Sequence, residues 1–287
     1  RQDGSFTFMF ANFVDDMVMK ISHIFRGEDH LTNTAGQVAL YEAFNATVPI
    51  FWHLPIIINE EGKKLSKRDF GFSLDDLRNS GFLEEAICNY LAIIGGSFKK
   101  EIMNLEELSK ELNFEEIAST SKIRYDVEKL RWVNHSWIKL LSLQDLTKRA
   151  RPFIENKFEK AKSLSDSQLE TLLKFVHIEL FTLEDSTKML SFYFEKPEIN
   201  SELLKQHNLE NYKNIIKLAL EAGYTSDAQK FMDFVQSECK KNNLAGKDIY
   251  AILRLALMGV ENGPSIKDLI NMLGAQEAQA RFEVVIT

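Results

Sequence analysis

A short basic segment in the first third of the chain carries the clearest candidate chemistry. Four of its six positions are cations: Lys63, Lys64, Lys67 and Arg68. Ser66 adds a hydroxyl group. Lysine ammonium groups are compact point charges that suit phosphate oxygens, and on a loop they can stabilise negative charge that builds on a leaving phosphate. Short basic runs are also common on solvated turns, so spacing alone leaves both interpretations open.

The elements that must hold this segment are predicted from the pattern around it. Aromatic and β-branched residues predict short strands over 6–14 and 21–26. Apolar spacing predicts a helix over 33–44, capped by Asn33 or Thr34, and the apolar run within 48–59 predicts a buried strand. Strand, helix and strand in this order are typical of a parallel α/β unit, whose ligands bind beyond the carboxyl ends of the strands.

A turn is predicted over 59–62, so the cations follow the last of these strands directly. From about residue 70 onward the pattern becomes helical, and no run of alternating strands appears after residue 150. Ser142 and Asp145 resemble a capping box with Asp in place of Glu. The expected helices cover 83–94, 104–112, 126–138, 142–154, 165–178, 182–194, 200–206, 208–222, 225–242, 246–258 and 264–272. Pro152, Pro197 and Pro264 are expected to interrupt this region.

The totals bound the class of protein. The 287 residues include 45% apolar and 27% charged side chains, which is typical of a folded chain of about two domains. The net charge of −7 argues against unspecific attraction to nucleic acid, although it permits a local basic surface. No apolar run reaches the roughly 18 residues that a membrane span needs.

The two cysteines, Cys88 and Cys239, form no pair with zinc-like spacing, so we expect no metal site. Cys88 lies in an apolar helical pattern, which predicts a buried, reduced thiol and a reducing intracellular compartment.

Several segments together resemble a known family. They are FTFMFANFVDD, ISHIFRGEDHLTNTAGQVALYEAF, HLPIIINEEGKKLSKRD and GFLEEAICNYLAIIGGS, with weaker likeness in KIRYDVEKLRWVNHSWI and LRLALMGVENGP. The chain resembles the C-terminal part of bacterial-type glutamyl-tRNA synthetases, which are class I aminoacyl-tRNA synthetases. The segment Lys64-Leu65-Ser66-Lys67-Arg68, called the KLSKR motif below, is similar to the KMSKS signature of that class.

The resemblance implies a ligase that joins L-glutamate to tRNA(Glu) through glutamyl-adenylate, with ATP and Mg²⁺ as the substrate complex. It implies a cytoplasmic monomer with no membrane contact. Lys67 is the expected main catalytic cation and Lys64 its support. Ser66 and Arg68 are expected to shape the loop.

The resemblance also assigns substrate contacts one residue at a time. Arg26 matches the arginine that binds a glutamate carboxylate, a task that suits a guanidinium fork. Asn12 is expected near the same substrate, although capping or a strand-end hydrogen bond remains open for it. Phe8 stands where relatives often carry Tyr, and this departure removes a hydroxyl. Asp29, Ile57 and Lys67 fall at ATP-binding positions of the family.

Neighbouring carboxylates at Asp15 and Asp16 resemble a family element that is not a metal site. A turn or a helix start is the expected place for both. The class also uses a HIGH-type motif, and none of the six histidines forms such a string. We therefore expect the chain to lack half of the ATP site and to be unable to form adenylate alone.

The resemblance implies a mainly α fold with a short Rossmann-type α/β remnant. We expect the catalytic part over 1–68, a helical stem-contact domain over 69–143, and a helical anticodon-binding region over 144–287, with a subdivision near 200. Glutaminyl relatives end in β-barrels instead. The chief alternative function is a non-catalytic tRNA-binding module derived from the enzyme.

Two positions concern the anticodon. Arg254 matches a family arginine at the anticodon-binding surface, but an arginine that extends from a packed helix face is an equal alternative. Leu180 stands where some relatives carry an arginine that reads the third anticodon base. Leucine cannot make that hydrogen bond, so we hypothesise that the protein accepts both tRNA(Glu) and tRNA(Gln).

Overall fold

The computed structural model describes residues 2–66, 69–71, 73–113 and 122–286. The chain forms two compact units, Arg1–Trp137 and Ile138–Thr287, each described here by itself. This division lies a few residues before the predicted boundary at 143/144. The predicted boundaries at 68/69 and near 200 stay predictions.

The first unit begins with a helix where a strand was predicted. Helix α1 covers Phe8–Val18. Its buried Phe13 packs edge-on against Tyr41, with ring centroids 4.8 Å apart, and lies 5.3 Å from the ring of Phe44. The strand prediction for 6–14 is wrong, because its aromatic residues fit both spacings and the contacts of Phe13 with Tyr41 and Phe44 favour the helix.

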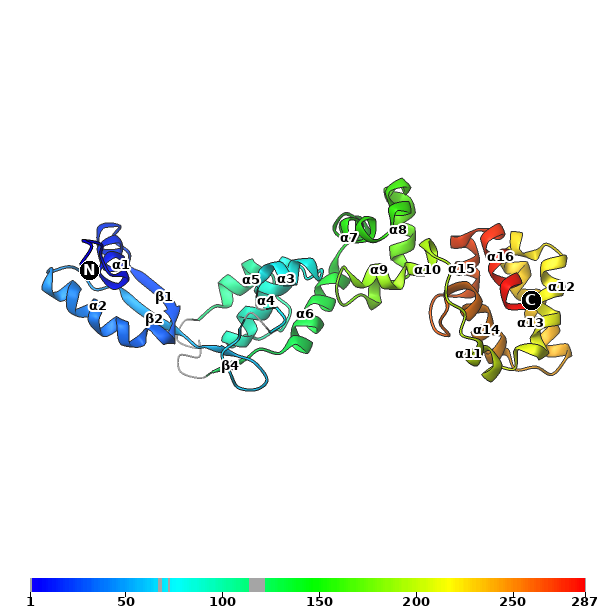
Figure 1. Ribbon diagram of the computed structural model, residues 1–287, viewed down its shortest axis with the longest axis horizontal. Helices are drawn as coiled ribbons and strands as arrows, with labels where there is room; N and C mark the ends of the chain where they lie inside the picture. The colour runs from blue at the N-terminus through cyan, green and yellow to red at the C-terminus, as the bar shows by residue number, and fades with distance from the viewer. Residues whose placement is uncertain (1, 67–68, 72, 114–121, 287) are drawn as a thin grey trace. The chain divides into compact units, whose positions relative to one another are not determined.

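A parallel α/β unit follows, as predicted. Strand β1 covers His23–Gly27, a short 3₁₀ turn covers Glu28–His30, helix α2 covers Leu31–Ala43 and strand β2 covers Ile50–Leu54. The two strands pair in parallel along their whole length (Figure 1), with His23 opposite Ile50 and Gly27 opposite Leu54. The predicted caps of α2 are wrong, because the helix begins at Leu31 and both Asn33 and Thr34 lie inside its first turn.

The buried strand predicted within 48–59 is wrong in two respects. Pro55 lies between β2 and a separate short strand, β3 at Ile57–Ile58, which pairs in parallel with β4 at Ile123–Arg124. Proline lacks the N–H that a continuing ladder needs. Both strands are also only half-buried along much of their length, and Ile50 is exposed.

The rest of the first unit is helical. It contains α3 (Leu74–Asn79), α4 (Glu84–Gly95), α5 (Leu105–Glu111) and α6 (Val127–Leu140), and the last of these ends inside the second unit. A capping box between Asn104 and Glu107 begins α5.

Helix α4 buries a short polar and apolar face. Its buried residues are Ala86, Asn89 and Tyr90. The amide oxygen of Asn89 accepts hydrogen bonds from the Met103 backbone and the Trp137 indole. Cys88 lies off this face and is exposed, so the prediction of a buried thiol is wrong.

The second unit is all-helical in the part that the structure describes. Its longer helices are α7 (Leu143–Lys157), α8 (Asp166–Lys174), α12 (Leu209–Glu221), α13 (Ala228–Lys241), α14 (Gly246–Met258), α15 (Ile266–Leu273) and α16 (Ala275–Ile286). Shorter ones are α9 (Asp185–Met189), α10 (Ser191–Phe194) and α11 (Ser201–Gln206). Ser142 caps α7 as predicted, whereas Pro152 lies within that helix and does not interrupt it.

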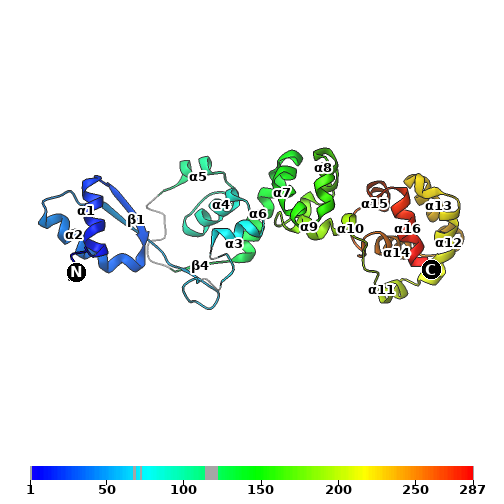
Figure 2. The same ribbon diagram turned by 45° about the horizontal axis from the view of Figure 1, so that its top comes forward.

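Helix α16 was not predicted, yet it helps to close the core of this unit. It lies among α12, α14 and α15 in both views (Figure 2). The ring of Phe282 stacks on Phe231 with centroids 5.1 Å apart. The buried Arg281 guanidinium donates to the carbonyls of Phe192 and Leu257, at 2.7 and 2.5 Å, and so ties the ends of α10 and α14 to α16. Among the described residues, no helix is long and apolar enough to cross a membrane.

Candidate active site

The end of β1 carries a network of neutral hydrogen-bond acceptors around one arginine. Nη1 of Arg26 donates to Oε1 of Gln37 at 2.6 Å, and Nη2 donates to Oγ1 of Thr34 at 2.5 Å. Nε2 of Gln37 donates in turn to Oδ1 of Asn12 at 2.8 Å. The structure therefore brings together Arg26 and Asn12, two residues that the sequence assigned to one substrate.

The charge of this arginine is not neutralised by a neighbouring carboxylate. Within the described residues Arg26 forms no ion pair, and its other close partner is the Phe51 ring, 4.8 Å from the guanidinium carbon. Burial lowers the pKa of Arg26 from its ordinary value, while the negative charge of Asp16 opposes that shift. A half-buried cation whose hydrogen-bond partners are all neutral favours an anionic ligand, because an anion offsets its desolvation.

His53 completes the network from β2. It is the register partner of Arg26 across the parallel strands, and its Nε2 lies 2.7 Å from Oγ1 of Thr34. Burial lowers the pKa of His53, and the positive charge of Arg26 lowers it further. The imidazole is therefore neutral at pH 7 and adds no second cation beside the arginine.

Sequence reasoning missed three residues of this network: Thr34, Gln37 and His53. A signal for two of them was present, because Thr34 and Gln37 are three residues apart on a predicted helix and therefore share a face. The apolar positions of the same helix form the stronger pattern, and that pattern predicts a buried face and not a polar site.

The other residues of α1 lie differently from their predictions. Phe8 is exposed, with its ring 6.5 Å from that of His30, and takes no part in the network of hydrogen bonds described above. Asn12 is one turn further along and points to Gln37 from within the helix, so it serves neither as a cap nor at a strand end. Asp15 and Asp16 lie in the second half of α1, so the prediction of a turn or helix start is wrong.

The predicted turn and the first part of the KLSKR motif form a tight hairpin. Asn59 donates its backbone N–H to the carbonyl of Lys63, and Leu65 donates to the carbonyl of Ile57 at 3.0 Å. Ile58 and Lys64 form an antiparallel bridge. Gly62 has φ +78°, a left-handed conformation that favours glycine at this turn. Lys67 and Arg68 lie outside the described residues.

The hairpin places Lys64 against the end of β1. Its Nζ lies 2.9 Å from Oδ2 of Asp29, and both side chains are substantially exposed. The hydrogen bond from Lys64 lowers the pKa of the Asp29 carboxyl. Exposed ion pairs contribute little to stability, so a phosphate can replace this carboxylate on the lysine. Lys64, Asp29 and the Ile57 carbonyl, all predicted site groups, thus belong to one neighbourhood.

Asp69 anchors the end of the motif. Its Oδ1 accepts from Nδ2 of Asn59 at 3.0 Å, and its Oδ2 accepts from both the backbone N–H and the hydroxyl of Ser66 at 2.8 Å. The shaping role expected for Ser66 is consistent with these contacts.

The two anticodon candidates lie on separate elements of the second unit. Arg254, in α14, donates from Nε to the carbonyl of Pro264 at 3.2 Å and from Nη1 to that of Glu261 at 3.4 Å. Through these contacts the arginine holds the loop after its own helix, and its predicted anticodon role stays a prediction. Leu180 is fully buried, so its side chain offers nothing to a base.

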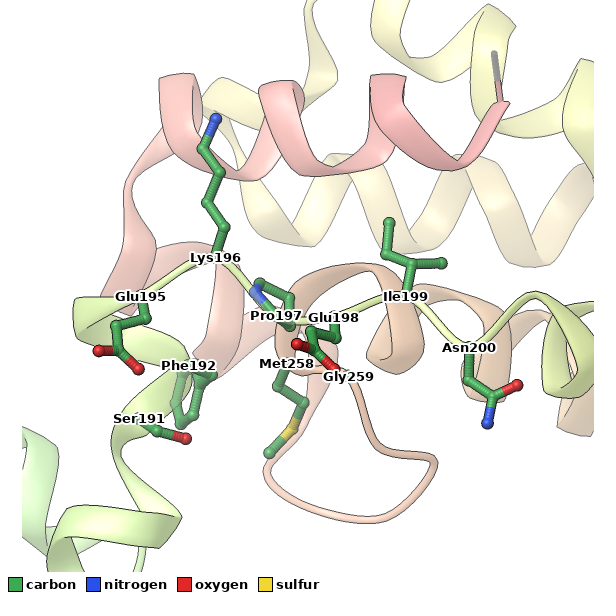
Figure 3. Close-up of a pocket in the computed structure, with 10 residues that line it drawn as sticks. All are labelled: Ser191, Phe192, Glu195, Lys196, Pro197, Glu198, Ile199, Asn200, Met258 and Gly259. Carbon is green, nitrogen blue, oxygen red and sulfur yellow. The ribbon is translucent and has the colours of Figure 1, made fainter.

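The second unit also contains a cavity of about 670 Å³ beside residues 195–200. Its lining includes Glu195, Glu198 and the end of α14 at Met258 and Gly259. Figure 3 shows the Lys196 side chain directed to the opposite side of the segment from the Glu195 carboxylate. Two carboxylates make this a poor phosphate site, and none of the predicted site residues that the structure describes lines it.

Each of the two units matches the model of a known protein family. Residues 1–132 match the model for the catalytic domain of class I tRNA synthetases (E and Q), and residues 145–286 match an anticodon-binding domain. Proteins called glutamate–tRNA ligase align with the whole chain. The chain belongs to the class I glutamyl-tRNA synthetase family.

Members of this family share both sequence and fold with the chain. Glutamate–tRNA ligase 1 of Pseudothermotoga lettingae is 36% identical over 290 residues, which cover 100% of the chain and 60% of that protein. The ligase of Akkermansia muciniphila is 34% identical, covering 98% and 65%. A crystal structure of the Elizabethkingia meningosepticum ligase with its amino acid superposes with a TM-score of 0.86 at 29% identity, covering 99% of the chain and 60% of that protein. The chain thus spans about 60% of the length of such relatives.

Proposed function

We propose that the full gene product is a glutamate–tRNA ligase, in which this chain supplies the arginine for glutamate and the lysines for ATP. The observation that carries the proposal is the state of Arg26. Its guanidinium is oriented by Gln37 and Thr34, keeps its charge, and lies on the strand that ends beside Asp29 and Lys64. The likeness to proteins called glutamate–tRNA ligase supports the same substrates.

In the proposed first step, one carboxylate of glutamate binds Arg26 and the α-carboxylate attacks the α-phosphorus of ATP in its magnesium complex. A bond forms between an oxygen of the α-carboxylate and the α-phosphorus. The bond from that phosphorus to the oxygen that leads to the β-phosphate breaks, and pyrophosphate leaves. The Lys64 ammonium leaves the Asp29 carboxylate and binds a phosphate oxygen instead. The position of Lys67 in the KLSKR motif assigns it as a second ammonium at the phosphates. Charge that develops on the leaving group strengthens these contacts in the transition state, which is what raises the rate.

In the second step, a ribose hydroxyl at the end of the tRNA attacks the glutamyl carbonyl, and AMP leaves. The match of residues 145–286 to an anticodon-binding domain supports a tRNA partner. We propose that the protein acts as a monomer, which sedimentation of the full gene product will test.

The first step is tested by glutamate-dependent exchange of pyrophosphate into ATP. In the full gene product, Lys64→Ala and Lys67→Ala are each expected to lower kcat, and the double variant to lower it by about 10²–10³-fold. Lys63→Ala is the matched control, because its ammonium is exposed and contacts only Glu61 among the partners found within the described residues. Pyrophosphate exchange that does not depend on glutamate, or a wild-type kcat in the double variant, would contradict the proposal.

We further propose that tRNA(Gln) is charged as well as tRNA(Glu). Leu180 is buried and offers no hydrogen bond to a base at the position where some relatives carry arginine. Aminoacylation of both purified tRNAs with glutamate should proceed with kcat/KM values within about tenfold of each other, a difference of about 1.4 kcal/mol. A much stronger preference for tRNA(Glu) would reject relaxed recognition and leave the ligase activity standing.

A further inference from the structure

Gln37 is a buried amide whose two ends are both engaged by candidate substrate residues. Its side chain is 1% exposed. Its oxygen accepts from Nη1 of Arg26 and its nitrogen donates to Oδ1 of Asn12. One side chain on α2 therefore sets the relative positions of a residue on β1 and a residue on α1.

The same face of α2 holds both terminal nitrogens of the guanidinium group. Thr34 lies three residues before Gln37 and accepts from the other terminal nitrogen, Nη2, while its hydroxyl also contacts His53. With one N–H of each terminal nitrogen directed to α2, the plane of the guanidinium is fixed. Each terminal nitrogen keeps a second N–H that can donate to a carboxylate oxygen.

We propose that Gln37 is a positioning residue that orients Arg26 and Asn12 together toward the carboxylate of glutamate. The inference rests on the proposed function and deepens it, because it names what determines glutamate affinity behind the contacting residues. An apolar side chain at this position leaves a guanidinium donor and the Asn12 oxygen without their partner.

The amide is suited to this task because it is neutral. A carboxylate at position 37 would hold Arg26 equally well, but it would neutralise the guanidinium and compete with the substrate for it. It would also be unable to donate to Asn12. The glutamine thus orients the arginine while leaving its charge available, in agreement with the absence of an ion pair to Arg26 within the described residues.

The experiment measures pyrophosphate exchange in the full gene product with Gln37→Glu, which keeps size and polarity, and Gln37→Met, which keeps size alone. We expect KM for glutamate to rise about 100-fold in Gln37→Glu and about tenfold in Gln37→Met. KM for ATP is expected to stay within about twofold, because Asp29 and Lys64 do not touch Gln37. A general packing defect would not separate the two substrates in this way.

The matched control is Glu42→Gln, the reverse exchange at an exposed position of the same helix, which should leave both constants unchanged. If circular dichroism shows that Gln37→Met does not fold, the KM values of Gln37→Glu alone test the inference. If Gln37→Glu exchanges pyrophosphate at the wild-type rate with an unchanged KM for glutamate, or if KM changes equally for glutamate and ATP, the inference about Gln37 is overturned. The proposed function then still stands. A wild type without glutamate-dependent exchange would overturn the proposed function and the inference with it.

Discussion

Asp69 shows how one carboxylate can organise a cationic loop through neutral donors. Hydrogen bonds from Asn59 and then Ser66 lower the pKa of Asp69, so its acceptor form is retained at neutral pH. One oxygen holds the start of the hairpin and the other holds Ser66 within the KLSKR motif. The negative charge is therefore engaged by neutral donors, while Lys64 contacts Asp29.

Replacing this side chain should affect turnover. We expect Asp69→Ala to lower kcat for pyrophosphate exchange about tenfold or more in the full gene product, because a loosened loop no longer places its cations for the transition state. Asp75→Ala is the control, since Asp75 is exposed and pairs with Arg78. Equal kcat values for the two variants would show that these hydrogen bonds do not position the loop.

Among elements, α11, α14 and the loop after α14 are joined by one histidine. His207 ends α11, its Nδ1 lies 2.9 Å from Oδ1 of Asp248 in α14, and its Nε2 contacts Glu261. Arg254 holds the same loop through the Glu261 and Pro264 carbonyls. The two contacts together fix the segment between α14 and α15.

This clip should make stability depend on pH. The hydrogen bonds to Asp248 and then to Glu261 raise the pKa of His207 above its ordinary 6.5. A raised pKa means that the folded state binds the proton more tightly, so the contribution is complete below about pH 6.5 and decreases as pH rises through the raised value. We expect the melting temperature to fall between pH 6 and pH 8 by roughly 2–4 °C more in the wild type than in His207→Gln.

The matched control for this titration is His23→Gln, an exposed histidine on β1 whose ring contacts Ser22. Its pH profile should follow that of the wild type. Identical profiles for the wild type and His207→Gln, measured by calorimetry, would show that the paired histidine does not contribute.

At the scale of the whole molecule, each unit has a core of its own. The second unit packs Phe231, Leu253 and Phe282 at 0% exposure, and Arg281 closes it by binding carbonyls of two other helices. Its buried apolar residues all come from within 138–287. Such a core is large enough to fold independently.

We therefore expect residues 127–287, which retain α6 intact, to fold alone and to unfold cooperatively by circular dichroism. Arg281→Met in that fragment should destabilise it by about 3 kcal/mol, because buried carbonyls and Glu277 lose their partner. Arg131→Met at a less buried position provides the comparison. Non-cooperative unfolding of the unaltered fragment would show that the unit depends on the rest of the chain.

Local patterns determined a large part of this structure. Ser142 caps α7 because its hydroxyl reaches an N–H only three residues away, and the turn over 59–62 follows from glycine at a left-handed position. The parallel pairing of β1 and β2 follows from strand, helix and strand in sequence. The likeness to the family pointed to Arg26, Asn12, Asp29 and Lys64, and the structure places these in two adjoining clusters.

What local patterns did not determine depends on partners distant in sequence. Residues 6–14 are as compatible with a strand as with a helix until Phe13 meets Tyr41 and Phe44. Cys88 is exposed because α4 turns Asn89 inward to bind Met103 and Trp137. The weakly patterned α16 is held through Phe231 and Arg281.

The sequence by itself determined where charges and hydrogen-bonding groups stand along the chain, because these belong to the residue. Its resemblance to the family predicted which of them bind glutamate and ATP. Only the tertiary structure decided that Gln37, Thr34 and His53 surround Arg26, and that Lys64 meets Asp29. These contacts join residues up to 35 positions apart. Their geometry arises when helices and strands pack, and no short stretch of sequence contains both partners.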